Sequence, residues 1–192
     1  MIPFVGVSYG RSGTQSLAKI LRADHESVRF PWYPTVKSMR DVAVFMRQKR
    51  GQIGFTNLSH LQFMRKTFPD LPVITIRRER GPCVESHLKI CGGDDRLSAL
   101  RLRDQATNAY PTLPDVNFPE AGWGCWWDIC TFMMDQIALP KYDLWMHELN
   151  CDEAMEGLCD WLESQGVPFD EDFHIPAKRR WDVNAKYRVT GL

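Results

Sequence analysis

Short apolar runs alternate along the chain with longer segments in which apolar residues recur every three or four positions. The runs predict strands at residues 2–7, 52–56, 72–77 and 142–147. The periodic segments predict helices at residues 13–23, 36–49, 58–67, 81–91, 95–109, 121–138 and 151–165. Because strands that alternate with helices favour a parallel sheet with helices on both faces, the pattern predicts an α/β fold.

The segments between these elements carry loop signals. Residues 110–120 hold three prolines and predict a loop, either a connector or a surface lid. Residues 174–192 form a tail that is basic at its start and has little periodicity. With 192 residues, 44% of them hydrophobic, and no internal repeat, the chain is predicted to form a single domain over residues 1–192.

Charge and cysteine usage narrow the class of protein. The chain has 24 basic and 24 acidic residues, so bulk attraction to nucleic acid is not expected. Its six cysteines form no C-x-x-C pair, which indicates reduced core thiols and no zinc site. No leader-like segment stands at the start, and no apolar run approaches the roughly 20 residues of a membrane helix. These features predict a cytoplasmic protein without a membrane partner.

The stretch GVSYGRSGTQSL, residues 6–17, joins the first predicted strand to the first predicted helix. In open parallel sheets, ligands bind beyond the carboxyl ends of the strands, and a helix start attracts anions. Glycine there lets the backbone approach a ligand, hydroxyls and an amide add donors, and arginine adds a planar permanent charge. The predicted anion ligands are Gly10, Arg11, Ser12, Gly13, Thr14 and Gln15. An ordinary capped turn is the alternative.

A second cluster of cations follows the strand predicted at residues 72–77. Arg77 and Arg78 stand at its end, and Arg80 follows. Nucleotide kinases and hydrolases place a carboxylate at such a strand end to help hold Mg²⁺, and here the charge is reversed. The cluster predicts a direct grip on a second anionic group, with Ser86 as a further donor on the next helix. A solvated cluster of surface arginines is the alternative.

Together the two motifs resemble those of the sulfotransferase family, which binds 3′-phosphoadenosine 5′-phosphosulfate. The segment from Arg11 to Leu17 resembles the family's R/K-S-G-T-T-x-L loop for the 5′-phosphosulfate. Arg78 and Ser86 match the arginine and serine of its R-[DN]-P-x-x-x-x-x-S motif for the 3′-phosphate, with Glu79 and Arg80 at the two positions between that differ. Two weaker similarities extend the resemblance. Phe68-Pro69-Asp70 resembles the family's F-P-D segment before the strand that ends in arginine, and His147-Glu148-Leu149 resembles its late Y-E-D-L segment.

The resemblance implies a three-layer, P-loop NTPase-like fold with a central parallel sheet. It also implies metal-independent, in-line transfer of a sulfuryl group to a hydroxyl or amine on a small molecule or carbohydrate. Arg11 stands where the family keeps a basic residue that contacts the sulfonate, and Lys178 and Arg179 of the tail are candidates to close over the 3′-phosphate.

The general base stays open between three residues and the alternative that none of them serves. Glu26 and His25 lie soon after the first predicted helix, and His60 lies beyond the second predicted strand. Two other functions also stay open. A small-molecule kinase using ATP and Mg²⁺ would need an acid at a strand end, for which only Glu148 stands in place. The second open function is that of a sulfotransferase relative that binds the nucleotide without turnover.

Overall fold

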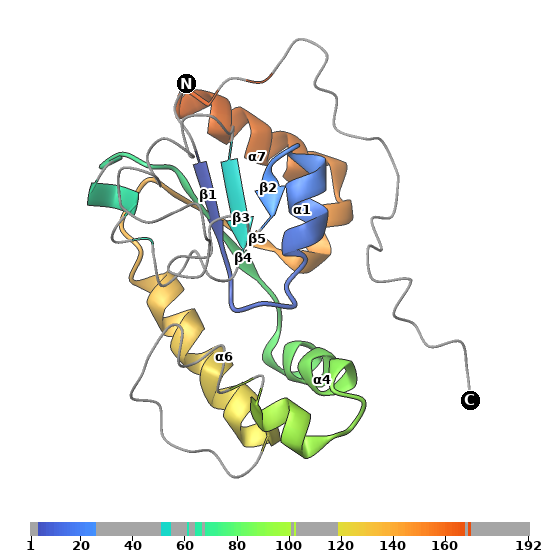
Figure 1. Ribbon diagram of the computed structural model, residues 1–192. Helices are drawn as coiled ribbons and strands as arrows, with labels where there is room; N and C mark the ends of the chain where they lie inside the picture. Colours follow the sequence, from blue (N-terminus) through green and yellow to red (C-terminus); the bar gives the residue numbers. More distant parts are fainter. Residues whose placement is uncertain are drawn as a thin grey trace.

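The computed structural model describes residues 4–25, 51–54, 61, 64–66, 68–100, 102, 119–167 and 169 (Figure 1). Within them five strands form one sheet with the order β2-β3-β1-β4-β5, and every pairing is parallel. The strands are β1 (Phe4–Val7), β2 (Asp24–His25), β3 (Gly51–Gly54), β4 (Val73–Arg77) and β5 (Lys141–Trp145). The predicted α/β class, with a parallel sheet flanked by helices, is therefore confirmed.

The helices of the described residues are α1 (Thr14–Ile20), α4 (Arg80–Ile90), α6 (Pro119–Asp135), the 3₁₀ helix η1 (Met146–Asn150) and α7 (Asp152–Ser164). They confirm the helices predicted at 13–23, 81–91, 121–138 and 151–165. In the helix predicted at 95–109, the described residues 95–100 and 102 are helical. In the helix predicted at 58–67, the described residues 61 and 64–66 are helical. The predicted helix at 36–49 and most of the loop at 110–120 lie outside the described residues.

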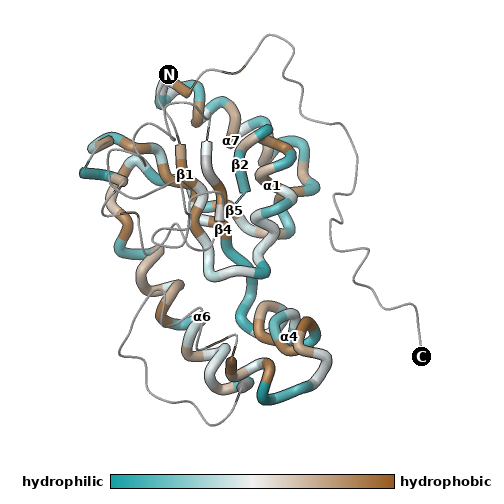
Figure 2. The backbone as a smooth tube through the Cα atoms, viewed as in Figure 1, coloured by the Kyte–Doolittle hydropathy of each residue, from teal (hydrophilic) through white to brown (hydrophobic). Residues whose placement is uncertain are grey.

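One predicted strand needs correction, and one strand was not predicted. The strand predicted at 142–147 begins at Lys141 and ends at Trp145, because the chain turns into η1 at Met146. β2 was not predicted at all. It is two residues long, lies at the edge of the sheet and is hydrophilic, whereas the central β1 is hydrophobic (Figure 2). A short polar edge strand leaves no apolar run in the sequence.

The sheet separates two hydrophobic cores. Side chains alternate along β1, so that Val5 and Val7 face α4 and α6 while Phe4 faces α1 and α7. On α6, the buried residues Trp123, Trp126, Cys130 and Met134 recur at helical spacing. On α7, Met155, Leu158 and Leu162 do the same against the other face. Helices therefore cover both faces of the sheet.

The parallel arrangement of the strands brings three chain segments together at one edge of the sheet. Because the strands are parallel, the carboxyl ends of β1, β4 and β5 lie at the same edge. The segment 8–13 after β1, residues 78–79 after β4, and η1 after β5 meet there. The candidate site is built from these three segments.

Two other expectations can be compared with the described residues. All six cysteines carry free thiols, and Cys83, Cys91 and Cys130 are buried as expected, but Cys125 and Cys151 are exposed. In the part of the chain that the structure describes, none of the helices has the length and apolar character needed to cross a membrane.

Candidate functional site

The loop between β1 and α1 turns through the left-handed region of backbone space. Gly10 has φ 85°, Arg11 has φ 53° and Gly13 has φ 86°. A Cβ on Gly13 would also lie 2.5 Å from Cδ1 of Leu149 in η1, so both the backbone angle and the packing require glycine at this position. The closely packed η1 therefore supports the loop from the β5 side.

Arg11 is the residue of this loop whose conformation is costly. A left-handed backbone costs a residue other than glycine about 1–2 kcal/mol, and such outliers concentrate at ligand sites. In return, the Arg11 side chain reaches α4, where its Nε donates a hydrogen bond of 3.1 Å to Oγ of Ser86. The structure thus joins a residue of the first motif directly to a residue of the second.

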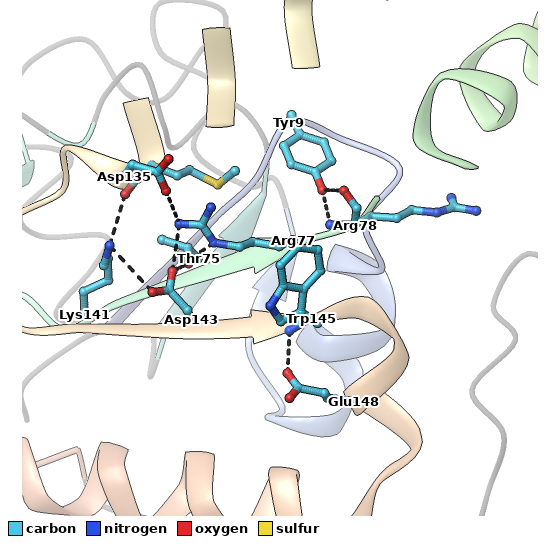
Figure 3. A network of polar contacts seen from close by, with 10 residues as sticks. Tyr9, Thr75, Arg77, Arg78, Asp135, Lys141, Asp143, Trp145 and Glu148 are labelled. Carbon is cyan, nitrogen blue, oxygen red and sulfur yellow. Dashed lines mark hydrogen bonds and ion pairs between the residues drawn. The ribbon is translucent and has the colours of Figure 1, made fainter. Parts of the chain in front are cut away.

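Arg78 makes a second connection between the motifs. Its guanidinium Nη1 donates to the backbone oxygen of Arg11 at 2.8 Å. Both backbone groups of Arg78 are bound by side chains. The Tyr9 hydroxyl accepts from its N–H and donates to its carbonyl, and Trp127 Nε1 donates to the same carbonyl at 2.9 Å. Figure 3 shows the Tyr9 hydroxyl against the Arg78 backbone.

The loop carbonyls face in a defined direction. The Gly10 oxygen accepts from Sγ of Cys83 at 3.6 Å, and the Arg11 oxygen accepts from Arg78. Because a trans peptide is planar, the N–H groups of Arg11 and Ser12 point away from these partners. Carbonyls thus face α4 and the end of β4, and amides face the opposite way. The Ser12 hydroxyl is fully buried and has no hydrogen-bond partner among the described residues.

Arg77 and Arg80, which were predicted to grip a ligand anion together with Arg78, are each paired with carboxylates of the protein. Side chains alternate along β4, so Arg77 points to the α6 side, away from Arg78 (Figure 3). There its Nη2 lies 2.8 Å from Oδ1 of Asp135 and 2.9 Å from Oδ1 of Asp143. Arg80 pairs with Asp128 of α6 at 3.2 Å.

Arg78 differs from both neighbours. Within the described residues, no carboxylate lies within ion-pair distance of its guanidinium. Arg78 is half-buried as a residue, and an arginine that no carboxylate of the described residues pairs is a candidate binder of an anionic ligand, because pairing stabilises its charge.

His25 is the candidate base that the structure describes. It ends β2, is half-buried, and its Nε2 lies 3.1 Å from Oγ1 of Thr14 at the start of α1. The imidazole therefore borders the loop. Glu26, His60, Lys178 and Arg179 lie outside the described residues. Gln15, a predicted ligand, is exposed on the first turn of α1.

Glu148, the acid a kinase would need, is engaged locally. Its Oε2 accepts a hydrogen bond of 2.6 Å from the backbone N–H of Trp145, where β5 passes into η1 (Figure 3). Across the described ranges, no three side chains of histidine, cysteine, aspartate or glutamate group in a way that could hold a metal ion.

Three residues, Tyr9, Trp127 and Cys83, build this site through contacts that the sequence does not predict. Tyr9 is 1% exposed and 69 residues from Arg78, Trp127 is 49 residues from it, and Cys83 is 73 residues from Gly10. Burial raises the pKa of Tyr9 above its ordinary range, more than its hydrogen bonds lower it, so the hydroxyl keeps its proton. Burial raises the pKa of the Cys83 thiol to about 12. Tyr9 lies inside the recognised loop, and this is the one signal that could have pointed to it.

Comparisons with known proteins add no assignment. No family model matches the chain, and a search of curated proteins finds no significant match. The basis for a functional assignment is therefore the motif residues and the geometry that brings Arg11, Arg78 and Ser86 together.

Proposed function

We propose that the chain binds 3′-phosphoadenosine 5′-phosphosulfate and transfers its sulfuryl group to a hydroxyl or amine acceptor without a metal ion. One observation carries the proposal. Arg78 and Ser86, which lie 67 and 75 residues from Arg11, meet it at the carboxyl edge of the sheet through direct hydrogen bonds. Two motifs recognised separately in the sequence thus form one cluster of cations and donors.

The fold supports the same proposal. The central strand β1 carries the glycine-containing loop, and β3 and β4 flank it in the order β2-β3-β1-β4-β5. Ligands of open parallel sheets bind outside the carboxyl ends of strands, where this loop lies. This order is the support for the second part of the proposal, that the fold is of the three-layer, P-loop NTPase-like class.

The orientation of the loop peptides suggests where each anionic group of the cofactor binds. The amides of Arg11 and Ser12 face away from Arg78, and the buried Ser12 hydroxyl lies on this loop. Successive amides of a turn with left-handed residues form an anion-binding concavity, which suits the 5′-phosphosulfate. Arg78 and Ser86 on the other side suit the 3′-phosphate. Two anion positions favour a ligand with two separated anionic groups over a simple phosphate.

The chemistry then requires little beyond positioning. The acceptor oxygen or nitrogen attacks sulfur, the bond from sulfur to the 5′-phosphate oxygen breaks, and negative charge develops on that oxygen. We expect the loop amides to stabilise this charge, whereas the Arg11 guanidinium, which bonds Ser86, lies on the side proposed for the 3′-phosphate. The acceptor proton passes to a general base, for which His25 is the candidate in the described residues and Glu26 and His60 are candidates outside them.

Isothermal titration calorimetry tests the cofactor class. The probes are adenosine 3′,5′-bisphosphate, adenosine 5′-phosphate and ATP with Mg²⁺, each also titrated in the presence of a chelator. We expect micromolar binding of the bisphosphate, well above the other two and unaffected by the chelator. Tighter, Mg²⁺-dependent binding of ATP would instead indicate a kinase, and binding of none of the probes would overturn the proposal.

Transfer itself is tested with the sulfated cofactor and a panel of an alcohol, a phenol, a carbohydrate and an amine. Formation of adenosine 3′,5′-bisphosphate that depends on one of these acceptors is the expected result. Tight bisphosphate binding without transfer to any acceptor would instead favour a nucleotide-binding relative that lacks turnover.

A further inference from the structure

Arg78 occupies the first position beyond the β4 ladder. The last β4 residue paired with β5 is Arg77, which lies opposite Trp145. The pairing of β4 with β1 ends two residues earlier, at Thr75. The backbone N–H and carbonyl of Arg78 have therefore left the sheet, and partly buried backbone groups of this kind need other partners.

Tyr9 and Trp127 supply these partners from two other elements. The Tyr9 hydroxyl, from the loop after β1, accepts from the Arg78 N–H and donates to its carbonyl. Trp127, on α6, donates its Nε1–H to the same carbonyl at 2.9 Å. The two aromatic rings also contact each other, with centroids 5.7 Å apart. Both lone pairs of the carbonyl oxygen and the single N–H are thus used.

Filling the core does not explain the Tyr9 hydroxyl. The ring belongs to the core between the sheet and α6, where phenylalanine would bury the same apolar surface. A buried hydroxyl is costly unless it is hydrogen-bonded. This one bonds both backbone groups of Arg78 and interacts with the side chain of Trp127, which itself bonds the Arg78 carbonyl. The hydroxyl therefore acts on the position of Arg78.

The position of the Arg78 backbone decides where its guanidinium can reach. The side chain starts from a Cα that Tyr9 and Trp127 fix, and its Nη1 ends 2.8 Å from the Arg11 oxygen. No carboxylate of the described residues holds the Arg78 guanidinium. The fixed backbone is therefore a main reason that this guanidinium keeps a defined position.

We propose that Tyr9 and Trp127 are positioning residues that hold Arg78 in place to bind the 3′-phosphate of the cofactor. This inference rests on the proposed function. Neither residue touches the ligand in this role. Their loss lowers affinity for nucleotides that carry a 3′-phosphate and leaves affinity for those without it unchanged, which a purely structural role would not produce.

The test compares the affinities of adenosine 3′,5′-bisphosphate and adenosine 5′-phosphate by competition binding. We expect Tyr9→Phe to weaken the bisphosphate by about 3–10-fold and Trp127→Phe by about 2–5-fold, as for lost hydrogen bonds of ordinary strength. Affinity for the monophosphate should change less than about twofold. Using both variants keeps the test decisive if one of them folds poorly.

Two matched controls separate positioning from general damage. Trp123→Phe changes a buried tryptophan on the same helix whose N–H donates to Ser98 at 2.8 Å, not to Arg78. Tyr142→Phe changes a tyrosine of β5 whose ring packs on Trp161. Both controls should keep the ratio of the two affinities. Equal ratios in Tyr9→Phe, Trp127→Phe and the wild type would overturn the inference.

A double-mutant cycle with Arg78→Ala shows whether the effect passes through Arg78. In that background Tyr9→Phe should weaken the bisphosphate no further, because the group that it positions is gone. A full additional loss would overturn the positioning role. A wild-type protein that does not prefer the bisphosphate would refute the proposed function first, and the inference with it. A preference that Tyr9→Phe leaves intact would refute the inference alone.

Discussion

Three arginines within four positions have three different roles in this protein. Arg77 lies between Asp135 and Asp143, Arg80 pairs with Asp128, and Arg78 extends toward the loop. The alternation of β4 and the start of α4 at Arg80 separate their directions. A residue's surroundings, not its type, decide which cation meets a ligand.

Arg78→Ala should weaken binding of adenosine 3′,5′-bisphosphate by about 1.5–3 kcal/mol, the usual strength of a hydrogen bond to a charged group. Calorimetric titration measures this change. Arg80→Ala is the matched control and should leave affinity nearly unchanged, since that guanidinium is paired with Asp128. Equal losses in the two variants would contradict the separate role of Arg78.

Gly13→Ala should destabilise the fold by about 1–3 kcal/mol in a denaturant titration. The added methyl group would need both a left-handed backbone and space that Leu149 already occupies at 2.5 Å. Gly81→Ala is the control, because a Cβ there meets no atom within 4 Å and the position lies in the first turn of α4. Its stability should stay equal or rise slightly. A Gly13→Ala protein of wild-type stability would show that the loop can relax.

Among the elements, an ion-pair network ties β4, β5 and α6 together behind the site. Arg77 of β4 bridges Asp135 of α6 and Asp143 of β5 (Figure 3). Lys141 lies 3.7 Å from Asp143, and Thr75 donates a hydrogen bond to it. The network holds the strand whose end carries Arg78.

The network predicts a pH dependence of stability. Burial alone would raise the pKa of the Asp143 carboxyl, but the hydrogen bond from Thr75 and the Arg77 guanidinium outweigh it and lower that pKa. A carboxyl with a lowered pKa stabilises the fold above its unfolded pKa of about 3.9 and loses that contribution as pH falls further. The difference in unfolding free energy between wild type and Asp143→Asn should therefore be greatest near neutral pH and shrink below about pH 4.

Denaturant titrations of both proteins across this pH range measure the difference. Asp143 is 45% exposed, so solvent screens its interactions. The decisive observation is therefore whether the difference in unfolding free energy shrinks or grows as pH falls, not how large the difference is. A difference that stays constant or grows toward acid would contradict the stabilising role of the ionised carboxylate.

At the scale of the whole molecule, the site joins the two cores. The loop after β1 contacts Leu149 of the core that contains α7, while Tyr9 and Cys83 belong to the core that contains α4 and α6. A ligand that bridges the loop and Arg78 would therefore connect both halves of the fold.

Ligand binding should thus raise the thermal unfolding midpoint of the whole protein. At a free concentration of adenosine 3′,5′-bisphosphate of 100 times Kd, linkage gives about 2.7 kcal/mol, and a domain of this size gains about 5–10 °C. Scanning calorimetry with and without the bisphosphate measures the shift. The Arg78→Ala protein, at the same ligand concentration, should show a much smaller one. No shift in the wild type would contradict binding to the folded state.

Much of the architecture could be predicted because the spacing of apolar residues along the chain indicates strands and helices. The apolar runs at β1, β3, β4 and β5 and the helical repeats of α4, α6 and α7 predicted a parallel α/β sheet with helices on both faces. β2 escaped prediction because two polar residues at a sheet edge produce no hydrophobic signal. The same local reasoning assigned three arginines to one task, since a sequence does not state which face each side chain takes once strand and helix meet.

By itself, the sequence determined the fold class and the anion motifs, because hydrophobic spacing and loop chemistry are local properties. Arg11, Gly13, Arg78 and Ser86 were named from their residue types, their positions and the resemblance to sulfotransferase motifs, and their roles as ligands remain predictions. Only the tertiary structure decided that Arg11 bonds Ser86, that Arg77 turns to Asp135 and Asp143, and that Tyr9 and Trp127 hold Arg78. These contacts join residues 49 to 75 positions apart, and such partners are chosen by the packing of strands and helices that no local pattern records.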